Sequence, residues 1–400
     1  WTPSSTVMVR ESLEQLEQED TSRRKSELGG ATIATLLRWQ TQIANQVAAE
    51  PHLNMEARDL IPETRSALTY APLASLGLPR IYAHAADREG CGHYLQPLEA
   101  LLSNARVSGG AATDPLPLAR MVADEFDTLI FQRPHTAPVL RAMHQYRQLS
   151  SALRIFEVDD LLTDVPESSP HARDFGPDTI ALFKQALGLC NRLVVPTEAL
   201  AQAYGQLVDE VRVVPNYLPK RVWNTLTPAR RSGNRPRVGW AGSISHLGDL
   251  ALLTDVVKTL ANEVDWVFLG TCSRDMLPYI SEKKAAVSFS QYPAALASMG
   301  LDLAIAPIAS NAFNEAKSNL KLLEYGILGY PVVCSDIGPY RQGLPVKRVT
   351  NTPQAWIAAI RERIHDTDAA RQEGIALRAQ VRQHWMLDDH LDEWLAAWTR

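Results

Sequence analysis

The sequence has few cysteines, and their positions do not suggest a metal site or a disulfide framework. Four of the 400 residues are cysteine, namely Cys91, Cys190, Cys272 and Cys334, and all four are far apart. Zinc sites and redox pairs place cysteines within a few residues of one another, and this spacing is missing here. Reduced thiols in a cytoplasmic protein are the simplest interpretation.

Long apolar runs and a basic excess are missing too. No stretch of about 18 uncharged apolar residues occurs, so we expect no membrane-spanning helix, while peripheral membrane contact stays open. The chain starts at Trp1 without a basic and then apolar leader, which predicts no secretion signal and leaves an upstream domain of a longer chain open. The formal net charge of −5 argues against a nucleic-acid partner.

Composition and periodicity divide the chain into five segments. Residues 1–78 contain charged and amphipathic helical patterns, and we expect a helical extension or connector there. Residues 79–217 and 237–380 alternate short apolar strands with helices. Residues 218–236 are a linker rich in Pro, Arg and Asn, and residues 381–400 are a helix expected to pack back on the first domain.

This alternation predicts an α/β fold with two Rossmann-like domains, because right-handed crossovers between strands build parallel sheets. The hydrophobic content of 46% and the length of 400 residues are sufficient for two cores. We expect the domains to face each other across a cleft at the carboxyl ends of their strands, where ligands of such sheets bind. Neither domain has GxGxxG after its first strand, which argues against a dinucleotide dehydrogenase.

The most informative segment is residues 311–336, NAFNEAKSNLKLLEYGILGYPVVCSD. The pattern predicts a helix from Lys317 to Gly329, which would place Lys317, Lys321 and Glu324 on one face. Two ammonium groups near the positive end of a helix suit a diphosphate, and a carboxylate suits the hydroxyls of a ribose. The alternative is a solvated face with an ion pair between Lys321 and Glu324.

The same segment resembles the donor-site signature of retaining GT-B glycosyltransferases of the family 4 type, in a branch with the pattern FNxAKSxLKxLEYGxxGxPVV. The matching residues are Phe313, Asn314, Ala316, Lys317, Ser318, Leu320, Lys321, Leu323, Glu324, Tyr325, Gly326, Gly329, Pro331, Val332 and Val333. This branch is associated with surface polysaccharide synthesis, and the resemblance extends over residues 79–400.

The resemblance implies that Glu324 holds the donor ribose and that Ser318 lies with the two lysines at the donor. The first of the two family glutamates falls on Ala316, and Glu315 is one residue early. Lys317 is therefore our candidate to replace that glutamate.

A second constellation follows a predicted strand that ends at Gly242, in the segment VGWAGSISHLGDL. Gly242 and Ser243 would let a phosphate approach the bare N–H groups of a helix that begins near Asp249. The segment is similar to the loop that GT-B enzymes place beside the donor diphosphate, where His246 would meet a phosphate or the acceptor. A common glycine turn and a structural histidine are the alternatives.

Two aspartates follow the predicted strand in RIFEVDDLL. Asp159 and Asp160 would project into the cleft and position the acceptor hydroxyl or the donor sugar. The pair is not a DxD motif, and GT-B enzymes generally bind their donors without a metal, so we expect no metal. Alternatively, Asp160 caps a turn.

The remaining candidates lie on other loops of the cleft. Gly92, His93 and Tyr94 follow the first strand and would touch the acceptor, and Arg133 ends another strand, where a phosphate contact and an ordinary salt bridge are equally open. Tyr292 falls where relatives bind the base and the sugar.

These observations predict a metal-independent enzyme without a cofactor that moves a sugar from a nucleotide-diphosphate sugar to an acceptor hydroxyl. The acceptor is a glycan, a lipid-linked glycan, a protein or a small molecule, and retention of the anomeric configuration is implied by the resemblance alone. Two alternatives stay open: an epimerase of sugar nucleotides, and a non-catalytic module that binds them within a larger protein.

Overall fold

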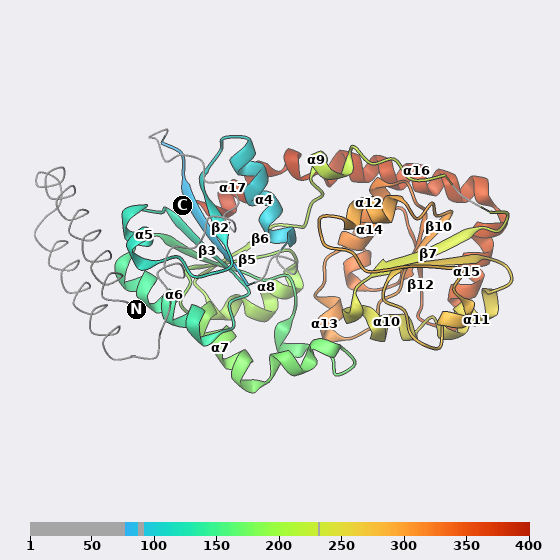
Figure 1. The fold of residues 1–400 in the computed structure, drawn as a ribbon, viewed down its shortest axis with the longest axis horizontal. Helices are drawn as coiled ribbons and strands as arrows, with labels where there is room; N and C mark the ends of the chain where they lie inside the picture. The colour runs from blue at the N-terminus through green and yellow to red at the C-terminus, as the bar shows by residue number, and fades with distance from the viewer. Residues whose placement is uncertain (1–76, 87–91, 231–232) are drawn as a thin grey trace, which may run out of the picture. The chain divides into compact units, whose positions relative to one another are not determined.

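The computed structural model describes residues 77–86, 92–230 and 233–400, which belong to one compact unit. The helical extension predicted for residues 1–78 lies outside the described residues, apart from its last two positions. Two parallel sheets organise the described part, each with helices packed on it (Figure 1).

The first sheet has six parallel strands in the order β2-β1-β3-β4-β5-β6. They are β1 (Arg80–Ala85), β2 (Ser108–Ala112), β3 (Thr128–Gln132), β4 (Leu153–Glu157), β5 (Arg192–Val195) and β6 (Glu210–Val213). The helices that follow these strands are α4 (Gly92–Ser103), α5 (Leu118–Ala123), α6 (Ala137–Leu149), α7 (Pro177–Leu187) and α8 (Glu198–Tyr204). A short helix, α9 (Lys220–Trp223), then leads to the second half.

The second sheet also has six parallel strands, in the order β12-β11-β10-β7-β8-β9. They are β7 (Arg237–Gly242), β8 (Asp265–Gly270), β9 (Glu282–Lys284), β10 (Leu303–Ala306), β11 (Val332–Ser335) and β12 (Lys347–Val349). Its helices are α10 (Leu247–Ala251), α11 (Thr254–Leu260), α12 (Tyr292–Ala297), α13 (Ala312–Glu315), α14 (Leu320–Ile327), α15 (Pro353–His365) and α16 (Thr367–His384). The two predicted Rossmann-like domains are confirmed.

The central strands have apolar residues at their centres and are buried on both faces. Every residue of β3, TLIFQ, is buried, and so is every residue of β10, LAIA. In parallel sheets that helices cover on both sides, the strands are continuous runs of buried, mostly apolar residues. Each sheet consequently has two apolar clusters, one on each side.

Two edge strands differ from the sequence pattern. The run VSFS at residues 287–290 is no strand; the strand in this region is β9, whose polar residues pair with β8. The pattern at β2, SGGAA, predicts no strand because it lacks β-branched and aromatic residues. Gly109 nevertheless pairs there with Ile81 at a backbone φ of 120°, and a Cβ would lie 1.9 Å from the Ile81 carbonyl oxygen.

The chain end returns to the first sheet. After α16, the helix α17 (Leu391–Trp398) lies beside the first sheet (Figure 1). The Trp398 indole N–H donates to Oε1 of the buried Glu157 over 2.6 Å. The Thr128 hydroxyl donates to the Trp398 carbonyl over 2.7 Å. Buried hydrogen bonds of this kind hold the C-terminal helix in a single position.

Candidate active site

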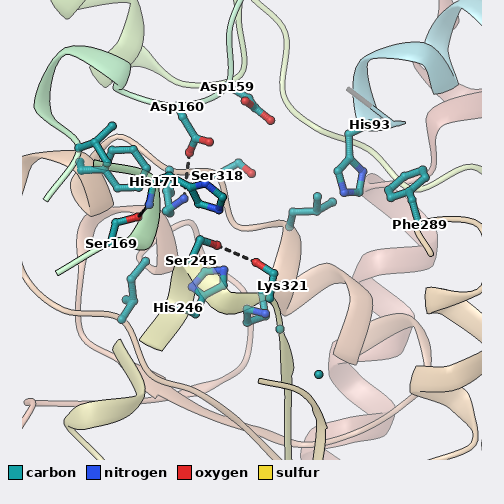
Figure 2. Close-up of a pocket in the computed structure, with 18 of the residues that line it drawn as sticks. His93, Asp159, Asp160, Ser169, His171, Ser245, His246, Phe289, Ser318 and Lys321 are labelled. Atoms are coloured by element: carbon teal, nitrogen blue, oxygen red, sulfur yellow. Dashed lines mark hydrogen bonds and ion pairs between the residues drawn. The ribbon is translucent and has the colours of Figure 1, made fainter. Parts of the chain in front are cut away.

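A cavity of about 870 Å³ lies at the carboxyl ends of the strands and is lined from both sheets. In Figure 2, Asp159 and Asp160 reach toward it from one side, and His246 and Lys321 from the other. Most predicted site residues line this cavity: His93, Arg133, Asp159, Asp160, Gly242, Ser243, His246, Tyr292, Lys317, Ser318, Lys321 and Glu324. Parallel strands direct the functional loops of each sheet to its carboxyl edge, and the two edges line the same cavity.

Gly92 and Tyr94 do not line the cavity. Gly92 packs so closely against Phe289 that a Cβ at this position would lie 2.5 Å from the Phe289 ring. Tyr94 is buried, with its hydroxyl near Asp159. His93 does line the cavity, edge-on to Phe289 at 4.7 Å between ring centroids (Figure 2), and burial lowers its pKa to about 4. Its imidazole is therefore a neutral contact group.

The helix expected from Lys317 to Gly329 begins later than predicted. Asn319 occupies the N-cap position of α14, and Lys317 lies in the bend between α13 and α14. Lys317 and Lys321 are thus not neighbours on one helix face, and the helix geometry inferred for them was wrong. The bend instead sends Lys317 toward the first sheet, and Ser318 accepts a hydrogen bond from Asn216 over 3.0 Å.

Glu324 is a buried carboxylate on α14, with only 5% of its surface exposed. The Tyr292 hydroxyl donates to its Oε2 over 2.9 Å. Burial raises the pKa of Glu324 to about 7, against the opposing effects of Lys321 and Tyr292. Because Glu324 is buried, the alternative of a solvated helix face is excluded for this residue.

Lys321 lies next to the end of β7. Its ammonium donates to the Ala241 carbonyl over 2.6 Å and lies 5.6 Å from the centre of the Trp240 ring. Burial lowers its pKa, while Glu324 and Asp249 act in the opposite direction. A carbonyl is a weak partner for an ammonium, so this charge is available to an anion that enters the cavity.

Lys317 forms an ion pair with Asp160, 2.9 Å between Nζ and Oδ1, so the bend before α14 is tied to the loop after β4. Burial alone would lower the pKa of Lys317, but Asp160 raises it above the usual value. Burial alone would raise the pKa of Asp160, but Lys317 and Arg133 lower it. Both partners are therefore ionised, and the proposed turn-capping role of Asp160 is not what its side chain does.

Asp159 differs from its neighbour. Its pKa is raised to about 6 by burial and then by Asp160, and Arg133 only partly offsets this. Arg133 has a backbone φ of 50°, which side chains larger than hydrogen adopt at a cost. Strained backbone of this kind gathers at functional sites. Here the strained residue, Arg133, is also the cation whose charge acts to lower the pKa values of Asp159 and Asp160.

The loop after β7 packs against the Trp240 ring. A Cβ at Gly242 would lie 2.5 Å from the Trp240 ring, so this strand end requires glycine. The Ser243 and Ser245 hydroxyls are 2.7 Å apart (Figure 2). The predicted helix begins at Leu247, two residues before Asp249.

Asp249 holds His246 in place. In the sequence pattern, Asp249 marked only the start of a helix and had no predicted role at the site. His246 Nδ1 lies 2.8 Å from Asp249 Oδ2, and Asp249 Oδ1 accepts from the Ala309 amide and the Asn314 side chain. Burial lowers the pKa of His246. A neutral ring that donates from Nδ1 leaves Nε2 as an acceptor, which favours a hydroxyl partner over a phosphate.

An outer wall of the cavity was not predicted from the sequence. Ser169, His171, Asp174 and Phe175 line it from the segment between β4 and α7. Phe175 lies 5.7 Å from His135 between ring centroids. These residues have no motif of their own, and only their position after Asp160 could have indicated them.

The arrangement of the two sheets is similar to that of solved glycosyltransferase structures. Sucrose-phosphate synthase from Thermosynechococcus elongatus matches 80% of this chain and 98% of its own, with a TM-score of 0.55 and 11% identity. HepE from Anabaena, in complex with UDP and glucose, matches 80% and 99%, with a TM-score of 0.56 and 14% identity. A glycosyltransferase from Rickettsia africae matches 80% and 98%, with a TM-score of 0.54 and 14% identity. The fold is therefore the GT-B fold.

No protein-family model matches the sequence, and no curated protein resembles it closely enough to count as a match. Within the described ranges, no helix combines the length and apolar character needed to cross a bilayer.

Proposed function

We propose that this protein is a cytoplasmic glycosyltransferase of the family 4 type, which moves a sugar from a nucleotide-diphosphate sugar to an acceptor hydroxyl with retention, in polysaccharide or other glycan synthesis. The observation that carries the proposal is the buried Glu324 beside Lys321 at the carboxyl end of β7. A buried carboxylate and a weakly paired ammonium suit a ribose and a diphosphate placed side by side.

Each part of the donor has a matching group. Glu324 accepts hydrogen bonds from the ribose hydroxyls, with Tyr292 fixing its orientation over 2.9 Å. Lys321 and the amides near Gly242 and Ser243 face the diphosphate. HepE, which shares the fold, was solved in complex with UDP and glucose, and this supports a nucleotide-sugar donor.

Catalysis in this arrangement is electrostatic. The bond between the sugar carbon and the diphosphate oxygen breaks, and the carbon bonds to the acceptor oxygen on the same face. The acceptor proton passes to the leaving phosphate. Lys321 stabilises the negative charge that grows on the diphosphate, a task that usually dominates such reactions. We propose that this transfer needs no metal, as the resemblance to GT-B enzymes implies.

The decisive experiment measures thermal stabilisation by UDP, GDP and ADP in the wild type and in Lys321→Ala and Glu324→Ala. A ligand at 100 times its dissociation constant stabilises the native state by about 2.7 kcal/mol. We expect one diphosphate to stabilise the wild type and neither variant, while Lys220→Ala, which removes an exposed ion pair with Asp389, behaves as the wild type. Equal stabilisation of all four proteins would refute the site.

Turnover is tested with the matching nucleotide sugars by release of the diphosphate in the presence of glycan acceptors. We expect release that depends on acceptor and disappears in both site variants. Binding without release would instead identify a non-catalytic module, and scrambling at the second carbon of the sugar would identify an epimerase.

A further inference from the structure

The described residues that line the cavity include four carboxylates: Asp159, Asp160, Asp174 and Glu324. Glu324 lies at the ribose end, 2.9 Å from Tyr292. Asp174 is at the outer wall, where it pairs with His171 in an exposed position. Asp159 and Asp160 are therefore the carboxylates that remain for the middle of the cavity.

The segment before α14 contributes no carboxylate to that place. Ala316 is 2% exposed and packs into an apolar cluster of the first sheet, and its carbonyl accepts from Thr197 over 2.8 Å. Glu315 points elsewhere and accepts from the Gly338 amide over 3.0 Å. A longer side chain at position 316 would enter the apolar core instead of the cavity.

The order of charged groups would put the Asp160–Lys317 pair next to the proposed diphosphate. Lys321 interacts with Glu324 on one side and with Lys317 on the other. Lys317 donates to Asp160 over 2.9 Å. A sugar on the second phosphate would lie beyond Lys321, against this pair. The pair presents an ammonium that donates and a carboxylate that accepts, the two partners that a hydroxyl needs.

On the basis of the proposed function, we propose that the Asp160–Lys317 ion pair binds hydroxyls of the donor sugar and selects an uncharged sugar over a uronic acid. Lys317 is paired with Asp160, and the charge of Arg133 acts on both Asp159 and Asp160. A sugar carboxylate would approach Asp160 while the neighbouring ammonium is already paired. Like charges that are close and partly shielded from water repel strongly.

The test compares two matched pairs of donors that differ only in oxidation at the sixth sugar carbon: UDP-glucose with UDP-glucuronate, and GDP-mannose with GDP-mannuronate. Dissociation constants are measured for these donors and for UDP and GDP in the wild type, Asp160→Asn and Lys317→Gln. Asp389→Asn is the matched control, because it removes an exposed lysine–aspartate pair away from the cavity.

We expect the wild type to bind the neutral sugar at least roughly 10-fold more tightly than the uronate of the same series. Asp160→Asn leaves Lys317 unpaired and shifts this preference toward the uronate by roughly 10- to 100-fold. Lys317→Gln leaves Asp160 unpaired and shifts the preference the opposite way. Opposite signs in two variants at one site cannot arise from a common loss of structure.

If UDP or GDP still binds, an unchanged preference in both variants, or a shift of the same sign in both, would overturn this inference and leave the proposed function intact. A wild type that binds neither diphosphate would instead remove the proposed function itself.

Discussion

Glu324→Gln should make the protein more stable and a poorer nucleotide binder at the same time. Glutamine has nearly the shape of the glutamic acid side chain and can still accept a hydrogen bond from Tyr292. It differs in that it never ionises. The substitution therefore isolates the consequence of a negative charge at a position that is 5% exposed.

The magnitude follows from the pKa of Glu324, which burial raises from 4.5 to about 7 in the folded protein. Because the folded pKa is the higher one, folding favours the protonated form. Stability is unaffected below the unfolded pKa, and it falls as the pH rises from 4.5 to about 7. Above both values the charge costs the folded state roughly 3 kcal/mol, which Glu324→Gln would recover as an upper limit.

The assay is urea unfolding at about pH 4 and about pH 8 with and without the nucleoside diphosphate that binds. At the acid pH we expect little difference between Glu324→Gln and the wild type. At the alkaline pH we expect the variant to gain about 1–3 kcal/mol and to lose roughly 10- to 100-fold in nucleotide affinity, the value of a charged hydrogen bond to the ribose.

A matched control is available in Glu157, another buried carboxyl, whose pKa burial raises to about 8. Its hydrogen-bond partners are Gln132 and Trp398, and none of these three residues lines the cavity. Glu157→Gln should gain stability at alkaline pH in the same manner and keep its nucleotide affinity. Equal nucleotide affinity in Glu324→Gln and the wild type, or a stability gain that does not change with pH, would refute the reasoning for Glu324.

Three further outcomes are expected. Because burial raises the pKa of Asp159 to about 6, the transfer rate should decline as the pH falls through that value. Asp159→Asn should lose this acid limb of the pH–rate profile. If the variant kept the limb, another group would be responsible for it. Incubation with EDTA should leave transfer unchanged, and recovery only on adding Mg²⁺ or Mn²⁺ would contradict the metal-independent proposal. Trp398→Phe removes the donor to Glu157 and should destabilise the protein by about 1–3 kcal/mol in urea without altering nucleotide affinity.

The sheets could be predicted wherever burial on both faces dictates the residues. TLIFQ and LAIA have apolar residues at their centres, and every residue in both strands is buried. The edge strands were harder, since β9 is polar and β2 is built from serine, glycine and alanine. At an edge, backbone pairing decides the structure more than side-chain burial, and single-sequence patterns contain little information about it.

The candidate site was predictable in position and less so in geometry. Loops after parallel strands leave the carboxyl edge of each sheet, so Asp160 of the first sheet and Gly242 of the second were expected to line one cleft. The helix start at Leu320 was not, because Ala316 is buried in the apolar cluster of the first sheet, a contact far along the chain that the local pattern does not contain. The ion pair of Lys317 with Asp160 joins residues 157 positions apart, which spacing rules cannot connect.

The energetics of the cavity themselves argue for a ligand. Burial acts against the charged forms of Glu324 and Lys321, whose pKa values move toward neutrality from opposite sides. A fold selected for stability alone would place apolar residues there, as it does at Ala316 a few positions earlier. Local departures of this kind are expected where binding compensates for them. If nucleoside diphosphates failed to stabilise the protein, these two buried charges would be left without a physical reason.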